Sequence, residues 1–414
     1  MEEHITMVGE PGNRYLGHIA PTKKDAKTIA DEMWAWFTEH GIAASLMVIG
    51  GDSTNLMTGY KGGIIHFLEE KIGHRLLIVV CKLHTNELPL RHLIKSRDIP
   101  TLSNNRFGGK IGELICGEVE KLTLDPNFKR IKDPRAALPH LTEDVVADLS
   151  TDQQQGYRLV VLIGGGAIDD NLLSQKQGPI SHARWLTTAN RMMSLYVRKN
   201  GLKGKEKKDL SLIVRHIVLC YYVLWFRIKI QYSILAAPGH VFAEMKIVRD
   251  ILPKAIQDVV MRKVNDGAWY AHSEHLLLHL LSSEEEEQRR FAVCKIVEIR
   301  GEAQFGDKSV RPFRVPTLNW STKKVEDMIS WEGATEPIYT ANLSQDQIRG
   351  FLDTPFTMNL LPSHSQSVER MVKEVSAASA NVFGAERRDG YVHARINARK
   401  LIPRGAKKSD IKML

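Results

Sequence analysis

The chain has 414 residues, more than the roughly 250–300 at which one hydrophobic core stops growing, so a single simple core is excluded. Its contents of 43% hydrophobic and 25% charged residues are ordinary for a soluble globular protein. The formal net charge of +9 and the pI of about 9.2 are compatible with a nucleic-acid partner but do not require one.

The four cysteines have no framework spacing, which is typical of a reduced, intracellular chain, nuclear or cytoplasmic. The start, from Met1 to Val8, is acidic and too briefly apolar for a signal peptide. The most hydrophobic segment, Leu210 to Leu235, is broken by charged residues, and its longest uninterrupted part, Ile217 to Phe226, is half of the roughly 20 residues that a membrane span needs. We therefore predict a buried helix there and no membrane partner.

The first 93 residues alternate between strand and helix patterns. The pattern predicts a strand at Ile5–Val8, a connecting stretch at Tyr15–Ile19, and a helix from about Lys23 to His40 that begins with a near capping box at Thr22. An apolar run then stops at Asp52, the segment from Leu56 to Gly73 reads as a helix, and a second apolar run covers Leu76 to Val80. This order predicts an α/β crossover with Asp52 in the crevice beyond the strand ends.

After Pro89 the pattern becomes irregular and then helical. Helices are expected at Arg184–Arg198, Leu210–Gln231, Val241–Val264 and Ser273–Gly301, whereas Arg158 to Ile163 fits a helix or a buried strand. A late helix with an apolar stripe from Val368 to Ala378 precedes a basic tail. The predicted organisation is an α/β core part (1–93), a helical insertion (94–360), a returning core helix (361–385) and the tail (386–414).

Gly50-Gly51-Asp52-Ser53-Thr54 supports two enzymatic interpretations. The first is a phosphate loop, because the segment resembles the Gly-Gly-Asp-Gly-Thr loop of the diacylglycerol kinase, NAD kinase and phosphofructokinase group. This chain departs from that loop at Ser53, where a side chain hinders close approach to phosphate. A nucleotide-dependent kinase is therefore the alternative hypothesis.

The second interpretation uses motifs along most of the chain. Asp52 at a strand end, Cys81-x-x-His84 after the next strand, Arg184-Trp185 in a helical insertion and Glu369 on a late helix occur in that order. The order resembles the hAT superfamily of DDE transposases, whose ribonuclease-H-like core is interrupted by a helical insertion. The segments His84–Leu93 and Ser181–Arg191 are also similar to blocks in uncharacterised metazoan proteins.

The resemblance implies two-metal phosphoryl transfer, in which three carboxylates hold two Mg²⁺ ions. Asp52 and Glu369 would supply two of those ligands. Trp185 would stack on a base extruded from DNA, Arg184 would contact a neighbouring phosphate, and Cys81 and His84 would support the loop beside Asp52.

Each assignment has a simpler alternative. Asp52 fits an N-cap of the following helix, and Glu369 fits a surface ion pair with Lys373. Trp185 fits a core tryptophan of the insertion, and Arg184 a partner of a helix carboxylate. Cys81-x-x-His84 could begin a zinc site, but no second Cys/His pair follows at ligand spacing.

The chain departs from the family at its start, because no acid-bearing strand pair precedes Ile5. The first catalytic aspartate is therefore expected to be missing, and the ribonuclease-H-like core incomplete at its N-terminus. The resemblance then implies a transposase-derived, DNA-binding remnant of a Mg²⁺-dependent strand-transfer nuclease, inactive as it stands. A non-enzymatic interaction protein and a homo-oligomer stay open.

Overall fold

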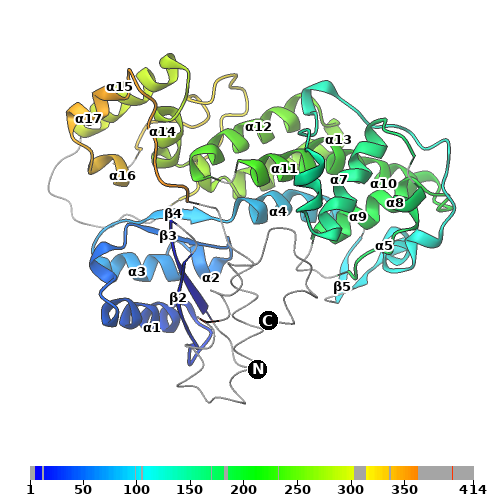
Figure 1. The fold of residues 1–414 in the computed structure, drawn as a ribbon, viewed down its shortest axis with the longest axis horizontal. Helices are drawn as coiled ribbons and strands as arrows, with labels where there is room; N and C mark the ends of the chain where they lie inside the picture. Colours follow the sequence, from blue (N-terminus) through cyan, green and yellow to red (C-terminus); the bar gives the residue numbers. More distant parts are fainter. Residues whose placement is uncertain are drawn as a thin grey trace.

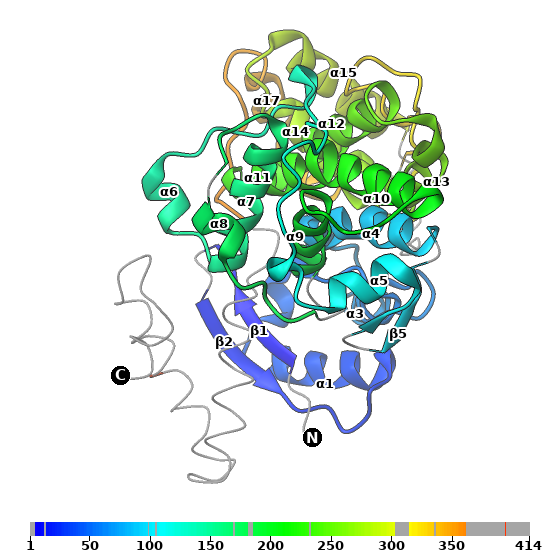
Figure 2. The same ribbon diagram turned by 90° about the vertical axis from the view of Figure 1, so that its right-hand side faces the viewer.

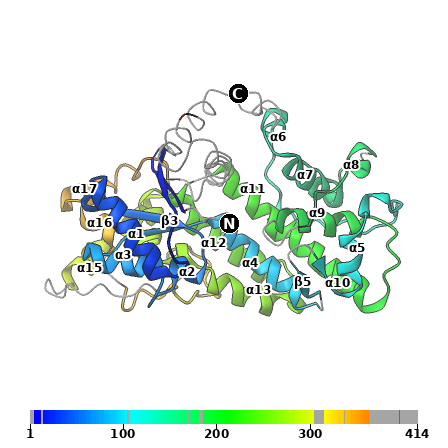
Figure 3. The same cartoon turned by 90° about the horizontal axis from the view of Figure 1, so that it is seen from below.

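A computed structural model describes residues 5–11, 14–97, 99–103, 106–168, 170–180, 185–231, 233–302, 314–334, 337–361 and 394. The protein is mixed α/β and mostly helical, with three small two-stranded sheets. Figure 1 shows an N-terminal layer of strands and helices from which a larger helical body extends. Seen from below, the N-terminal layer and α15–α17 lie at one end, and α5, α8 and α10 lie at the other (Figure 3). The predicted combination of α/β and helical parts is confirmed at this level.

The chain opens with an antiparallel hairpin of β1 (Ile5–Gly9) and β2 (Arg14–Ile19), in which Ile5 pairs with Ile19 (Figure 2). The expectation of a mere connecting stretch at Tyr15–Ile19 is therefore wrong. Gly17 interrupts the apolar pattern of this strand, and a Cβ there would lie 2.8 Å from the Trp36 ring. Position 17 is therefore a glycine because the following helix packs closely against it. Since a glycine breaks the alternation of apolar residues, the sequence pattern does not indicate a strand here.

Helix α1 (Ala26–Glu39) begins later than predicted, because Asp25 and not Thr22 caps it: Asp25 Oδ1 accepts a hydrogen bond from the Thr28 N–H at 2.9 Å. The next strands, β3 (Val48–Gly51) and β4 (Leu77–Val80), pair in parallel, which confirms the predicted crossover. The connecting helix is divided into α2 (Asn55–Thr58) and α3 (Ile64–Ile72). They are separated at Gly63, where a Cβ would lie 2.5 Å from the Gly59 nitrogen.

Strand β4 links two hydrophobic cores. Ile78 and Val80 belong to the smaller core, together with the apolar faces of α1 and α3. Leu77 and Val79 point the other way, into the large core of the helical body. Every residue of β4 is buried, which explains why its sequence is a continuous apolar run.

The two N-terminal sheets share a core without sharing a hydrogen bond ladder. Met7 of β1 and Ile49 of β3 both belong to the smaller core. In the described part of the chain, however, β1 pairs only with β2, and β3 pairs only with β4. Each of these pairs therefore keeps an edge without a strand partner among the described residues.

Helix α4 (Lys82–Lys95) carries the chain into the helical body, where it packs chiefly on α13. The short hairpin of β5 (Thr101–Ser103) and β6 (Arg106–Phe107) follows. The remaining helices are α5 (Gly109–Cys116), α6 (Glu143–Ala147), α7 (Thr151–Gly164), α8 (Asp170–Ser174), α9 (Trp185–Tyr196), α10 (Gly204–His216), α11 (Tyr222–Ile230), α12 (Ala237–Asp250), α13 (Lys254–Asp266), α14 (Ser273–Leu281), α15 (Glu286–Glu302), α16 (Ile338–Ala341) and α17 (Gln345–Gly350).

Two of the segments that we predicted to be single helices each form two helices. The helix expected at Val241–Val264 ends as α12 and resumes as α13 after Pro253, which cannot donate a helical hydrogen bond. The helix expected at Ser273–Gly301 is likewise divided into α14 and α15. The ambiguous run from Arg158 to Ile163 is helical, as part of α7. Pro89 does not end α4, which continues for six residues beyond it.

The most apolar helix passes from α10 through a π-helical turn, Ile217–Tyr221, into α11. Among the described residues, this helix, Gly204–Ile230, is the one that is long and apolar enough to span a membrane. Its most apolar window is 83% buried inside the protein, as in the core helix of a globular fold. All residues from Ile217 to Phe226 are buried, in agreement with the predicted buried helix.

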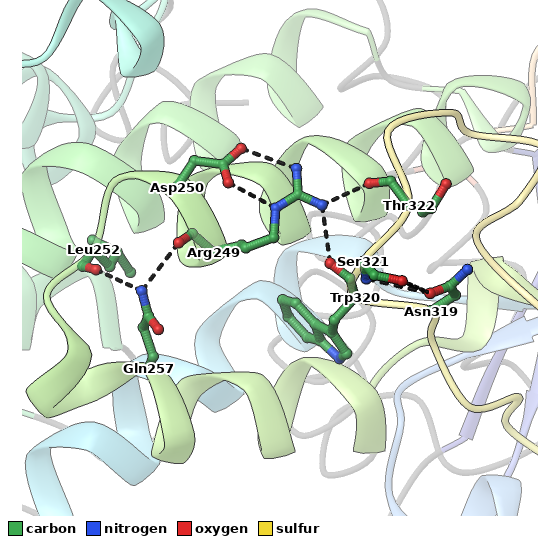
Figure 4. Close-up of polar contacts among 8 residues, drawn as sticks. All are labelled: Arg249, Asp250, Leu252, Gln257, Asn319, Trp320, Ser321 and Thr322. Carbon is green, nitrogen blue, oxygen red and sulfur yellow. Dashed lines mark hydrogen bonds and ion pairs between the residues drawn. The ribbon is translucent and has the colours of Figure 1, made fainter.

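An arginine at the end of α12 binds the backbone of the segment 314–334 (Figure 4). Asn265 of α13 also holds this segment, because its Oδ1 accepts hydrogen bonds from the Leu318 N–H at 3.3 Å and from the Trp320 indole N–H at 3.2 Å. Arg249 donates from one terminal nitrogen to the backbone carbonyls of Trp320, at 2.9 Å, and Thr322, at 2.6 Å. Its other nitrogens bind the Asp250 carboxylate at 2.7 and 3.0 Å, which fixes the guanidinium plane. The segment thus has a defined place although it holds no helix or strand.

Candidate functional site

Asp52 lies directly after β3, at the carboxyl end of the parallel pair, as predicted. It is exposed, and its Oδ1 accepts hydrogen bonds from the Thr54 backbone N–H at 3.0 Å and from the Thr54 hydroxyl at 2.7 Å. This is a local Asx turn, and the cap residue of α2 is Thr54. The carboxylate therefore shapes the loop.

Cys81 follows β4, caps the start of α4 and is buried. Burial raises the pKa of its thiol to about 11, more than the nearby N–H groups of His84 and Leu83 lower it; the charges of Glu87 and Asp52 raise it further. The thiol is thus protonated at neutral pH and poorly nucleophilic. Cys81 thus lies close enough to Asp52 to feel its charge, and His84 lies in the first turn of α4. The supporting role of both residues stays a prediction.

Helix α4 also carries acid-base residues that sequence reasoning missed. Glu87 lies one turn after His84, and burial raises the pKa of its carboxyl to about 8. Lys82 Nζ lies 3.2 Å from Glu244 Oε2 of α12, and both side chains are almost fully buried. A signal did exist for Lys82, which lies on the buried face of α4, whereas Glu87 is half-buried beside that face. The other buried positions of the helix are Thr85, Asn86, Pro89, Leu90, Leu93 and Ile94.

Trp185 opens α9 and is only 4% exposed. Its ring packs edge-on against Phe107, with centroids 5.9 Å apart, and the Arg91 guanidinium lies 5.8 Å from its centroid. This environment matches the core-tryptophan alternative, and stacking on an extruded base would require the indole to leave the core. The adjacent Arg184 lies outside the described residues.

Glu369, the returning helix and almost all of the basic tail lie outside the described residues. The distance between Asp52 and Glu369 therefore stays a prediction, as does the Mg²⁺ site that they would form. Within the described part of the chain, no three His, Cys, Asp or Glu side chains come together in a way that could hold a metal ion.

Close packing explains the two glycines of the suggested phosphate loop without a bound phosphate. A Cβ at Gly50 would lie 3.1 Å from the Val79 carbonyl of the paired strand, and one at Gly51 would lie 2.8 Å from the Met57 methyl. The following helix α2 has four residues, too few to offer a developed helix dipole to a nucleotide phosphate.

A basic surface lies at the junction of α9 and α10. It comprises five exposed lysines without an ion-pair partner in the described structure: Lys129, Lys199, Lys203, Lys207 and Lys208. Two bonds bring its parts together, from the Tyr196 hydroxyl to the Lys129 carbonyl at 2.9 Å and from the Lys199 N–H to the Thr123 carbonyl at 2.8 Å. Five lysines between 199 and 208, against one glutamate, are the signal in the sequence.

A comparison of the chain with known protein families, with curated proteins and with solved structures finds no match. The chemistry of the site is therefore argued from its own residues. These provide one exposed carboxylate at a strand end, a buried polar cluster behind it, and a separate basic surface.

Proposed function

We propose that this protein is a transposase-derived nucleic-acid-binding protein, the remnant of a Mg²⁺-dependent DNA strand-transfer nuclease. The observation that carries the binding part is the basic surface. Its lysines are exposed and form no ion pair with a described carboxylate, and their ammonium groups attract a phosphate backbone and release its counterions. Contacts of this kind position a protein on DNA without reading sequence.

The finer fold proposal is a ribonuclease-H-like core. The order of hairpin, helix, strand ending at Asp52, helix and strand supports it, as does the parallel pairing of β3 with β4. A further strand carrying an aspartate would fit between the hairpin and β3, because among the described residues both strand pairs have an unpaired edge over the same apolar core. Such a strand would place a second carboxylate beside Asp52.

Titration with a fluorescent DNA duplex tests the binding proposal. We expect salt-dependent binding by the wild-type chain, and weaker binding by a K203Q/K207Q/K208Q variant. In a plot of log affinity against log salt concentration, each lost phosphate contact lowers the magnitude of the slope by about 0.9. The three substitutions should therefore lower it by up to about 2.7.

The matched control is K23Q/K27Q/R262Q, which removes the same charge from exposed positions on the N-terminal layer and α13. We expect its slope to stay at the wild-type value. If both variants lost DNA affinity equally, the net charge of the protein and not the basic surface would explain the binding. A wild-type chain that does not bind DNA would contradict the proposal.

A further inference from the structure

One cavity of the described structure is lined by residues 227–243, 279–282 and 356–358, and neither Asp52 nor a lysine of the basic surface lines it. It has a volume of about 560 Å³ and lies between the end of α11, the start of α12, α14 and residues 356–358. This volume is in the range of small-molecule sites, roughly 300–1,000 Å³. Its lining is Arg227, Gln231, Leu235, Ala236, Gly239, His240, Ala243, His279, Ser282, Phe356, Thr357 and Met358.

The cavity is cationic. Arg227 is half-buried in its wall, and no described residue accepts a hydrogen bond from the guanidinium. No aspartate or glutamate lines the cavity. A half-buried guanidinium without a carboxylate is costly to desolvate, and an anion with two oxygens is the ligand that fits its fork.

Two imidazoles in the same wall act as hydrogen bond acceptors. His279 Nδ1 lies 2.6 Å from the Leu235 carbonyl and must donate to it, which leaves Nε2 with a lone pair. His240 is 4% exposed, its ring faces the Gln231 carbonyl, and its Nε2 is buried without a partner. Burial lowers the pKa of His240 to about 4 and also lowers that of His279, so both rings are neutral at pH 7.

We infer that this cavity binds a protonated phosphate group, either inorganic phosphate or a small phosphate monoester taken up as its monoanion. The charged oxygens would face Arg227, and the P–OH proton would be donated to His240 or His279. Sulfate and carboxylate carry a comparable charge but no proton to donate at pH 6.5, and a DNA phosphodiester has none either. The site therefore distinguishes ligands by whether they can donate a proton as well as by their charge.

The rest of the lining fits the organic part of a monoester. Phe356, Met358 and Leu235 give one apolar side to the cavity, and the Ser282 hydroxyl adds a polar group. Gly239 keeps the histidine accessible, because a Cβ there would lie 3.2 Å from His279 Nε2. This geometry favours a compact ligand over a polymer.

Isothermal titration of the full chain at pH 6.5, in buffer free of other oxyanions, provides the test. The probes are inorganic phosphate, glycerol 3-phosphate, sulfate and a DNA duplex. We expect phosphate or glycerol 3-phosphate to bind at least about tenfold more tightly than sulfate, because sulfate has no proton to donate and leaves the buried His240 Nε2 unpaired. The stronger of the two phosphate probes identifies the free anion or the ester as the ligand.

Arg227→Gln should abolish phosphate binding and leave DNA binding unchanged, whereas Arg262→Gln, an exposed arginine on α13, should change neither. Equal affinities for sulfate and phosphate in the wild type would overturn the inference without any variant. So would full phosphate binding by Arg227→Gln, or a loss of DNA affinity in that variant. Because the inference concerns a separate cavity, its failure leaves the DNA-binding proposal untouched.

Discussion

Of the acidic residues near the strand ends, some are exposed to solvent and others are covered by the helical body. Asp52 is exposed and bound only to Thr54, whereas Glu87 is held where its charged form is disfavoured. Asp52 stood out in the sequence because a carboxylate directly follows an apolar run. Glu87 did not, because its burial comes from packing partners far away in the chain, such as the π-helical turn on which Tyr221 lies.

Glu87→Gln should therefore change the pH dependence of stability. The pKa of Glu87 is raised in the folded state to about 8, so the native chain holds a proton that the unfolded chain releases near pH 4.5. The free energy of unfolding of the wild type therefore falls as the pH rises from about 4.5 to about 8. The glutamine variant does not show this fall, because its side chain does not titrate. Urea unfolding should show near-equal stabilities at pH 4 and an advantage for the variant of at least about 1.4 kcal/mol at pH 8.5. Parallel curves for both proteins would show that Glu87 is freely solvated.

Helices and strands were predicted well where the local pattern agreed with the packing, and poorly where tertiary contacts interrupt it. The parallel strands and α1 follow from their apolar periods. The division of α2 from α3, and the passage of α4 through Pro89, do not, because close backbone contacts and a buried environment decide them. The π-helical turn is another example: the carbonyl of Tyr221 accepts a hydrogen bond from Asn86, 135 residues earlier in the chain.

At the same scale, Arg249→Ala should loosen the segment 314–334 without unfolding the helices. Arg249 is the link from α12 to the carbonyls of Trp320 and Thr322, and charged hydrogen bonds of this kind contribute about 1.5–3 kcal/mol. Hydrogen exchange should accelerate at the amides of Asn319 and Thr322. Arg249→Lys should show most of the same effect, because an ammonium group has three donors and no planar fork, and cannot make all four of these hydrogen bonds. Unchanged exchange would show that the hydrogen bonds to Asn265 and the apolar contacts hold the segment without Arg249.

The whole molecule consists of a thin N-terminal layer and a large helical body that meet across β4. The sheet of the N-terminal layer is discontinuous in the described structure, since the hairpin and the parallel pair share a core but no ladder. In the proposed ribonuclease-H-like core, the carboxylate that completes a two-metal site belongs to a strand in that position. Asp52 alone is a weak ligand for Mg²⁺, which prefers several oxygen ligands.

We therefore expect the purified chain to leave duplex DNA uncut in the presence of Mg²⁺ or Mn²⁺, although it binds the duplex. Incubation with supercoiled plasmid and separation on a gel measure this directly. Asp52→Ala is the control for a contaminating nuclease. Metal-dependent cleavage that disappears in Asp52→Ala would contradict the prediction and would mean that other carboxylates complete the site.

The sequence by itself determined the mixed α/β class, the parallel crossover, the place of Asp52 at a strand end and the burial of the apolar helix. These features depend on neighbours within a few residues, which apolar periods record. Only the tertiary structure decided that β1 and β2 form a hairpin, that Trp185 lies in the core, that the Lys129 and Lys199 segments form one surface, and that Arg227 and two histidines line one cavity. Each of these depends on residues brought together from distant parts of the chain, which no local pattern contains.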